Sequence, residues 1–108
     1  MAANLYDDIP DRLPKELFTQ LLDAPGLRIE RIVSWGQCSE EDFWYDQNRH
    51  EWVLLVEGSA AVLFEGDDEP VELRPGSFLE IPAHRRHRVV RTDADKRTVW
   101  LAVHYDCL

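Results

Sequence analysis

Short stretches of alternating apolar and polar residues, separated by turn-forming residues, are the feature that most restricts how this chain can fold. Residues 27–33 alternate in this way, and Gly36 ends the run. A period of two is typical of a β-strand with one buried face. Turn residues recur at short intervals afterwards, and the strand-like segments between them are residues 43–47, 52–56, 60–64, 71–73, 77–81, 87–91 and 98–104. This pattern predicts an all-β sandwich or barrel, and 108 residues are enough for one core.

The N-terminal part of the chain departs from this pattern. Apolar residues recur there at helical spacing, after a proline at position 14, and they are Leu13, Leu17, Phe18, Leu21 and Leu22. Proline is tolerated in the first turn of a helix, and the Pro25-Gly26 pair that follows would end one. We therefore predict one short N-terminal α-helix, and we divide the chain into a helical segment, residues 1–26, and a β-domain, residues 27–108.

Composition and charge argue against several classes of partner. The chain carries 21 acidic and 12 basic side chains, a net charge of −9, and phosphate backbones or anionic lipids repel such a surface. No apolar run approaches the roughly 20 residues that cross a bilayer, and the N-terminus does not look like a signal peptide. We expect a cytoplasmic protein that binds neither nucleic acid nor a membrane, with Cys38 and Cys107 as free thiols.

Two segments of the β-domain carry the residues from which a function can be predicted. Glu51 is followed by six residues and Gly58, and Gly76 is followed by five residues and Pro82, with His87 five positions after that proline. These segments resemble the two motifs of the cupin superfamily, and the resemblance covers about residues 27–106. It implies an antiparallel, jelly-roll-like β-barrel. The chain also looks like a group of small bacterial cupins that have a short N-terminal helix and a WYDQ segment, here residues 44–47.

In cupins, the positions of Glu51 and His87 hold a metal ion. Elementary chemistry agrees, because a buried carboxylate beside an imidazole must bind a cation or pair with its neighbour. The histidine pair that precedes the glutamate in the family is absent here. We predict that Glu51 and His87 meet inside the barrel and hold one divalent ion, which could be zinc, iron, manganese or nickel. A metal-free hydrogen-bonded pair is the alternative.

Other polar residues are candidates for completing this site. A hairpin over residues 89–98 would put His104 on the same face as His87, although a slip of one residue would turn it away. His50 directly precedes Glu51 and should face the other side of the sheet. Besides Glu51 and His87, we take as candidate metal ligands His84, His104, Asp46 and Gln47.

The resemblance implies a metal-dependent enzyme of the dioxygenase, isomerase or decarboxylase type. Basic residues crowd into positions 84–97, which suggests a small anionic substrate oriented by Arg85 or Arg91, with Tyr45 as a further contact. The same arginines could instead form salt bridges on a solvated strand face. A metal-free module that binds or senses a small ligand is the second hypothesis, because the histidine pair is missing. A homodimer that pairs through the strand at residues 27–33 is the third, and it is compatible with either function.

The chain lacks other recognisable chemistry. It has no glycine-rich phosphate loop, no GxSxG elbow and no HExxH pair. Nucleotide binding and serine hydrolysis are therefore disfavoured.

Overall fold

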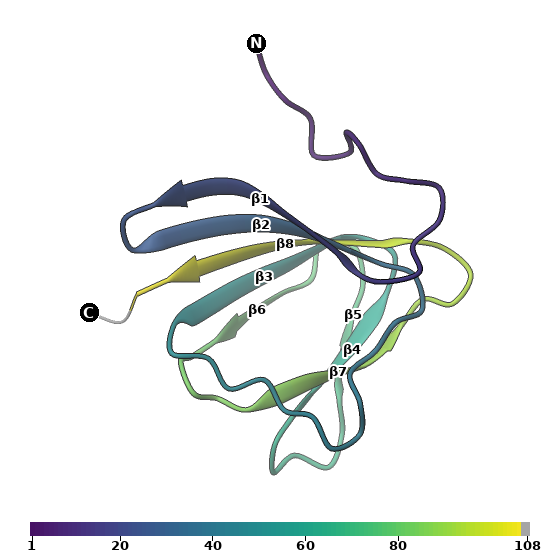
Figure 1. Cartoon of the computed structure of the whole chain (residues 1–108). Helices are drawn as coiled ribbons and strands as arrows, with labels where there is room; N and C mark the ends of the chain where they lie inside the picture. Colours follow the sequence, from purple (N-terminus) through teal and green to yellow (C-terminus); the bar gives the residue numbers. More distant parts are fainter. Residues whose placement is uncertain (107–108) are drawn as a thin grey trace.

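Within residues 1–106, eight antiparallel strands in two sheets make up the fold (Figure 1). The structure is a computed structural model that describes residues 1–106. The larger sheet has the order β1-β2-β8-β3-β6 and the smaller sheet has the order β5-β4-β7. The strands are β1 (Leu17–Ala24), β2 (Leu27–Ser34), β3 (His50–Glu57), β4 (Ala60–Phe64), β5 (Val71–Leu73), β6 (Phe78–Ile81), β7 (His87–Thr92) and β8 (Thr98–Tyr105). The all-β antiparallel prediction is confirmed.

The predicted N-terminal helix is wrong, since residues 1–106 contain no helix and residues 17–24 form β1. β1 pairs with β2 through a two-residue turn at Pro25-Gly26, in which Ala24 lies opposite Leu27. Gly26 has a φ of +73°, which a type II turn with proline before glycine requires. The domain boundary that we placed after residue 26 therefore falls within a hairpin of the larger sheet.

A β-bulge explains why the leucine spacing of β1 looks helical. The register of β1 against β2 shifts between Gln20 and Leu22, so one extra residue is inserted there. Leu22 consequently lies opposite Ile29 and shares a face with Leu17, which lies opposite Val33. Residues five apart would face opposite sides in a regular strand. The bulge breaks the period of two in the sequence of β1. Pairing with β2 overrides the helical preference that this spacing indicates.

The strand order of the larger sheet shows that the predicted edge strand is not at the edge. β2 lies between β1 and β8, so the strand at residues 27–33 has both neighbours and is not open for edge-to-edge pairing (Figure 1). β1 is the edge, and it exposes Phe18, Leu21 and Leu22. Among residues 43–47, which we expected to form a strand, only Tyr45 makes a bridge, with His87.

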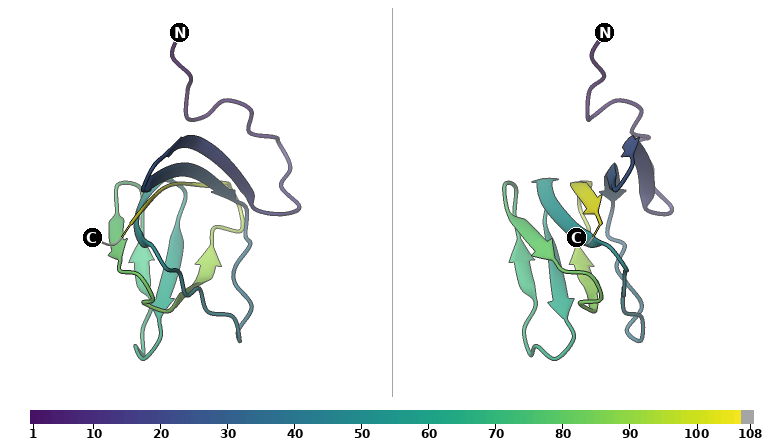
Figure 2. Two further views of the ribbon diagram at one scale, coloured as in Figure 1. Left: turned by 60° about the vertical axis from the view of Figure 1, so that its left-hand side comes forward. Right: turned by 90° about the vertical axis from the view of Figure 1, so that its left-hand side faces the viewer.

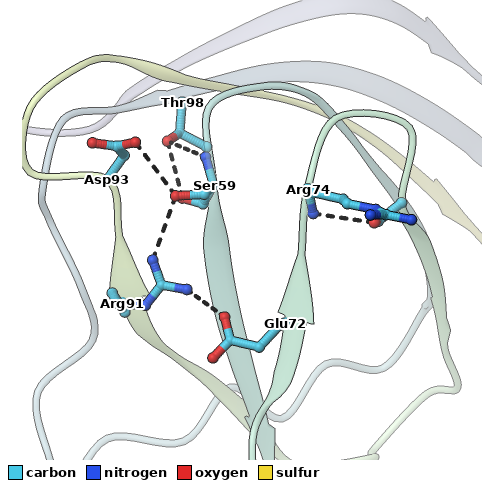
Figure 3. A network of polar contacts seen from close by, with 7 residues as sticks. Ser59, Glu72, Arg74, Arg91, Asp93 and Thr98 are labelled. Carbon is cyan, nitrogen blue, oxygen red and sulfur yellow. Dashed lines mark hydrogen bonds and ion pairs between the residues drawn. The ribbon is translucent and has the colours of Figure 1, made fainter.

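β7 and β8 belong to different sheets, so the predicted hairpin over residues 89–98 is wrong. β7 pairs with β4, whereas β8 pairs with β2 and β3. The connection between them is held by Ser59, whose carbonyl accepts from the backbone of Asp93 at 3.1 Å and from Thr98 Oγ1 at 3.2 Å (Figure 3 shows these side chains). Gly58 has a φ of +91°, and a Cβ there would lie 2.4 Å from Thr98 Oγ1. Gly58 lies between β3 and β4, which also belong to different sheets, so its missing side chain lets this connection pack closely against the start of β8.

The hydrophobic core lies between the two sheets, which form two facing layers (Figure 2). It consists of Val53, Leu55, Ala60, Val62, Leu73, Ile81 and Trp100. The indole of Trp100 donates to Ser34 Oγ at 3.2 Å, which satisfies its buried N–H. No helix in residues 1–106 is long and apolar enough to cross a membrane.

Candidate functional site

Glu51 and His87 meet between the two sheets. Glu51 is on β3, where alternate residues face inward, and His87 is the first residue of β7. Their side chains are 10% and 7% exposed, and His87 Nε2 lies 3.9 Å from Glu51 Oε1. The structure thus brings together two residues that are 36 positions apart. Their role as metal ligands stays a prediction.

The ring of His87 is oriented by its neighbours. Its Nδ1 lies 2.8 Å from the carbonyl oxygen of Arg85, which can only accept, so Nδ1 carries the proton. In the neutral ring, Nε2 is then a lone-pair donor directed toward Glu51. Tyr45 stacks on the ring at 5.4 Å, and the two residues exchange backbone hydrogen bonds. His87 therefore presents one free nitrogen in a fixed orientation.

Burial raises the pKa of Glu51 above its ordinary value. Desolvation is the largest cause, and the nearby Glu30 carboxylate acts in the same direction. Electrostatic interactions with His104 and His87 oppose the rise. The Glu51 carboxyl therefore keeps its proton to higher pH than an exposed glutamate does.

His104 faces inward as predicted, although for a different reason. It lies opposite Glu51 in the β3–β8 ladder and is 4% exposed. Its Nε2 donates to Glu30 Oε1 at 2.9 Å, and this hydrogen bond is the largest cause of the lowered pKa of Glu30. The nitrogen that would bind a metal is thus engaged with a carboxylate. His104 and Glu30 form a largely buried hydrogen-bonded pair in the cavity wall.

Gln47 and Tyr45 complete the inner surface near Glu51. Both line the same cavity as Glu51 and His87. Gln47 Oε1 is buried and has no hydrogen-bond partner within residues 1–106. In the sequence, Tyr45 and Gln47 alternate and stand before three residues and Glu51, which is the spacing of the missing cupin histidine pair. Counting back four and six residues from Glu51 identifies Gln47 and Tyr45 as this pair.

Asp46 and His84 lie at the mouth of the barrel. His84 Nδ1 is 2.8 Å from Asp46 Oδ1, and both side chains are largely exposed. His84 has a φ of +64°, in the region that favours glycine, and the cupin motif has glycine at this place. Neither residue lines the inner cavity. The structure does not bring them to Glu51 as predicted.

The predicted substrate arginines lie elsewhere. Arg85 is over the ring of Phe64 and pairs with Asp67 at 3.6 Å. Arg91 pairs with Glu72 on the smaller sheet (Figure 3). Neither arginine lines the inner cavity or its mouth. These residues form the surface salt bridges that were the alternative interpretation.

Two charged residues of β2 escaped the sequence analysis. Glu30 lines the inner cavity and Arg28 lines its mouth. Alternation along this strand does not by itself show which face is directed to the core. In the structure, the N-terminal segment covers the face that carries Arg31, which donates to the carbonyls of Leu5 and Asp7. The charged residues are thereby turned toward the interior.

A cavity of about 80 Å³ is lined by polar and by apolar residues. The polar ones include Glu30, Tyr45, Gln47, Glu51, His87 and His104. Its apolar lining includes Val53, Val62, Ile81 and Trp100. No group of three or more His, Cys, Asp or Glu in residues 1–106 is placed to hold a metal ion. A metal ion would therefore need Gln47 as a third ligand beside Glu51 and His87.

Comparisons with known proteins agree with this architecture. The cupin domain family model matches residues 33–104. A crystal structure from Ralstonia eutropha JMP134, provisionally described as a mannose-6-phosphate isomerase, is 51% identical, with 99% of each chain covered and a TM-score of 0.94.

Two more distant structures show the same fold. A cupin superfamily protein from Desulfitobacterium hafniense DCB-2 is 21% identical, with 92% of this chain and 84% of that chain covered and a TM-score of 0.75. An RmlC-like cupin from Methanocaldococcus jannaschii with a double-stranded β-helix fold is 14% identical, with 92% and 87% covered and a TM-score of 0.70. No curated protein matches the chain. Because the family model spans more than half of its length, this protein belongs to the cupin domain family.

Proposed function

We propose that this cupin binds one divalent metal ion through Glu51, His87 and Gln47 and acts as an isomerase on a small acidic hydroxy-carbonyl compound. The observation that supports it most is the 3.9 Å separation of His87 Nε2 and Glu51 Oε1. Two metal bonds of about 2.1 Å can bridge donors up to about 4.2 Å apart. The unpartnered Oε1 of Gln47 supplies a third donor.

The donor set fits a divalent ion. It offers one imidazole nitrogen with a lone pair, one carboxylate and one amide oxygen without a hydrogen-bond donor. When bound, such an ion supplies Lewis-acid polarisation of a substrate oxygen. Gln47 is a weaker ligand than histidine, so we expect looser binding than a site with three histidines would give.

Glu30 and His104 provide the base for proton transfer. Hydrogen bonding to His104 Nε2 keeps the Glu30 carboxylate ionised, and both residues line the cavity beside Glu51. An isomerisation of this kind moves a proton between two adjacent carbons, one of them beside a carbonyl. Glu30 would accept that proton from one carbon and return it to the other, while the hydroxyl proton of the substrate passes to the former carbonyl oxygen. His104 would hold the Glu30 carboxylate in place.

The Ralstonia eutropha protein favours isomerisation over the other reactions that the fold hosts. It is 51% identical over almost the whole chain, and its provisional description is that of a mannose-6-phosphate isomerase. Conversion of an aldose to a ketose needs a base and stabilisation of charge on an oxygen. Glu30 can fill the first role, and a divalent ion held by Glu51 and His87 would fill the second.

Elemental analysis of protein prepared without a histidine tag tests metal binding. We expect close to one equivalent after incubation with Zn²⁺, Mn²⁺, Fe²⁺ or Ni²⁺ followed by desalting. Glu51→Gln and His87→Ala should lose the metal. His50→Asn is the matched control, because His50 adjoins Glu51, lines neither the cavity nor its mouth, and uses Nδ1 to accept from Ala83 N, as an Asn oxygen could. Less than about 0.1 equivalent in the wild type, with no binding on titration, would overturn the metal proposal.

A metal-free binding module is the second candidate function. The absence of a three-ligand cluster of His, Cys, Asp and Glu in residues 1–106 favours it, and so does the raised pKa of Glu51, which burial causes. A protonated Glu51 can donate to a ligand oxygen without any metal. A thermal-shift screen separates the two functions, because stabilisation by organic ligands in the presence of EDTA, with none by divalent ions, would support the binding module.

A further inference from the structure

The mouth of the barrel is a second, wider pocket that continues from the inner cavity. It has a volume of about 760 Å³, and Gln47 and His104 line both spaces. The mouth is more polar than the cavity and carries several charged residues, namely Asp23, Arg28, Asp46, Arg49 and His84. A ligand whose reacting end enters the small cavity must leave its remaining atoms in this mouth.

Arg28 differs from the other cationic side chains of the mouth. Arg49 Nε pairs with Asp106 at 2.8 Å, and His84 pairs with Asp46 at 2.8 Å. Arg28 makes no ion pair within residues 1–106, although Asp23 lies opposite it in the β1–β2 register. Its Nε is buried and has no hydrogen-bond partner in this part of the chain. A buried guanidinium N–H without a partner is costly, so a ligand that accepts from it would gain binding energy.

The position of Arg28 links it to the reacting groups. It lies opposite His104 in the β2–β8 ladder and two residues from Glu30, on the same face of β2. Its positive charge contributes to the lowered pKa of Glu30, after the larger effect of the His104 hydrogen bond. Arg28 is therefore near the proposed base and also lines the mouth.

We propose that Arg28 binds the carboxylate or phosphate group of the substrate at the mouth of the barrel. The proposal rests on the proposed function, since it assigns the acidic end of the same substrate. It places a single anionic group at the mouth and the carbonyl end in the cavity. The chain as a whole carries a net charge of −9, so an anion needs such a local cation to bind. A guanidinium holds either anion through two parallel hydrogen bonds.

Calorimetric titration with inorganic phosphate and with succinate tests this subsite. Arg28→Gln should weaken binding of the anion at least tenfold, which corresponds to about 1.4 kcal/mol. Arg49→Gln is the matched control, because Arg49 lies in the same mouth and already has an acidic partner; it should change binding less than about twofold. Binding of phosphate alone indicates a phosphate ester as substrate, and binding of succinate alone indicates a carboxylic acid; both support the proposal.

The proposal fails if neither anion binds the wild type at millimolar concentration, or if Arg28→Gln binds them as well as the wild type does. Thermal unfolding of each variant verifies that it is folded. The same titrations on Glu51→Gln separate this proposal from the metal proposal. If the wild type binds phosphate or succinate but no metal ion, the metal proposal is wrong and the Arg28 subsite is not. If the wild type binds a metal ion but neither anion, the Arg28 subsite is wrong and the metal proposal is not.

Discussion

Two groups of charged side chains in this protein have opposite surroundings. The inner group comprises Glu30, Glu51, His87 and His104, which are buried or nearly so and converge on one cavity. The outer group consists of exposed arginines paired with acids, such as Arg86 with Glu65 at 2.7 Å. In the inner group, burial raises the pKa of Glu51 and the hydrogen bond to His104 lowers the pKa of Glu30. The exposed Asp93 also has a lowered pKa, and its main cause is a hydrogen bond from the backbone of Asp95 in its own turn. A charged side chain can take part in chemistry where burial removes it from water. The number of charged residues along the sequence does not show which of them are buried.

Removing His104 from the Glu30–His104 pair should have the largest effect on stability. His104→Ala leaves Glu30 without its hydrogen bond in the cavity wall, and we expect a loss of about 3–5 kcal/mol of unfolding free energy. The outer counterpart is Arg91→Ala, which breaks the exposed pair with Glu72 and should cost less than about 1 kcal/mol. Urea unfolding measures both. Equal losses would remove the distinction between the two groups.

The pH dependence of stability should separate Glu51 from the outer acids. Because burial raises the pKa of Glu51 in the folded protein, its contribution to stability is present below the ordinary glutamate pKa and is lost as pH rises through the raised value. Glu51→Gln cannot ionise, so in EDTA it should gain stability relative to the wild type as pH rises over this window. Urea midpoints measured across that range test the idea. Parallel curves for the wild type and Glu51→Gln would contradict it.

The smallest effect is expected from the arginines that the sequence singled out. Arg85→Ala removes an exposed contact with Phe64 and an ion pair with Asp67. We expect a stability change below about 1 kcal/mol and unchanged binding of phosphate and succinate. The binding titration described for Arg28 provides the measurement. If Arg85→Ala lost anion binding, the substrate would bind at the outer group of charged residues and not at Arg28.

The strand positions were largely predictable from the sequence, because a period of two with intervening turns depends on local residues. The strands from β3 to β8 fall close to the expected segments. β1 was not predictable in this way, since a bulge at Leu21 gives the strand a helical spacing and only pairing with β2 decides its structure.

The site was predictable in part. Glu51 and His87 follow from motif spacing, and the structure places them together. His104 was assigned to the correct face from a hairpin that does not exist; it faces inward because it lies opposite Glu51. Arg28 and Glu30 were missed, because charged residues on a strand normally face solvent. Here the N-terminal segment covers the opposite face, through contacts between residues more than 20 positions apart.

The most direct test of the central claim is the ¹⁵N NMR spectrum of the histidine rings during titration with Zn²⁺. The four histidines have different surroundings: His87 has a free Nε2 beside Glu51, His104 bonds to Glu30, His84 is exposed, and His50 accepts from Ala83. We predict that the Nε2 signal of His87 changes first and saturates at one equivalent of Zn²⁺, while the signals of His50 do not move. A spectrum in which only His84 responds, or in which no ring responds, would contradict a metal site formed by Glu51 and His87.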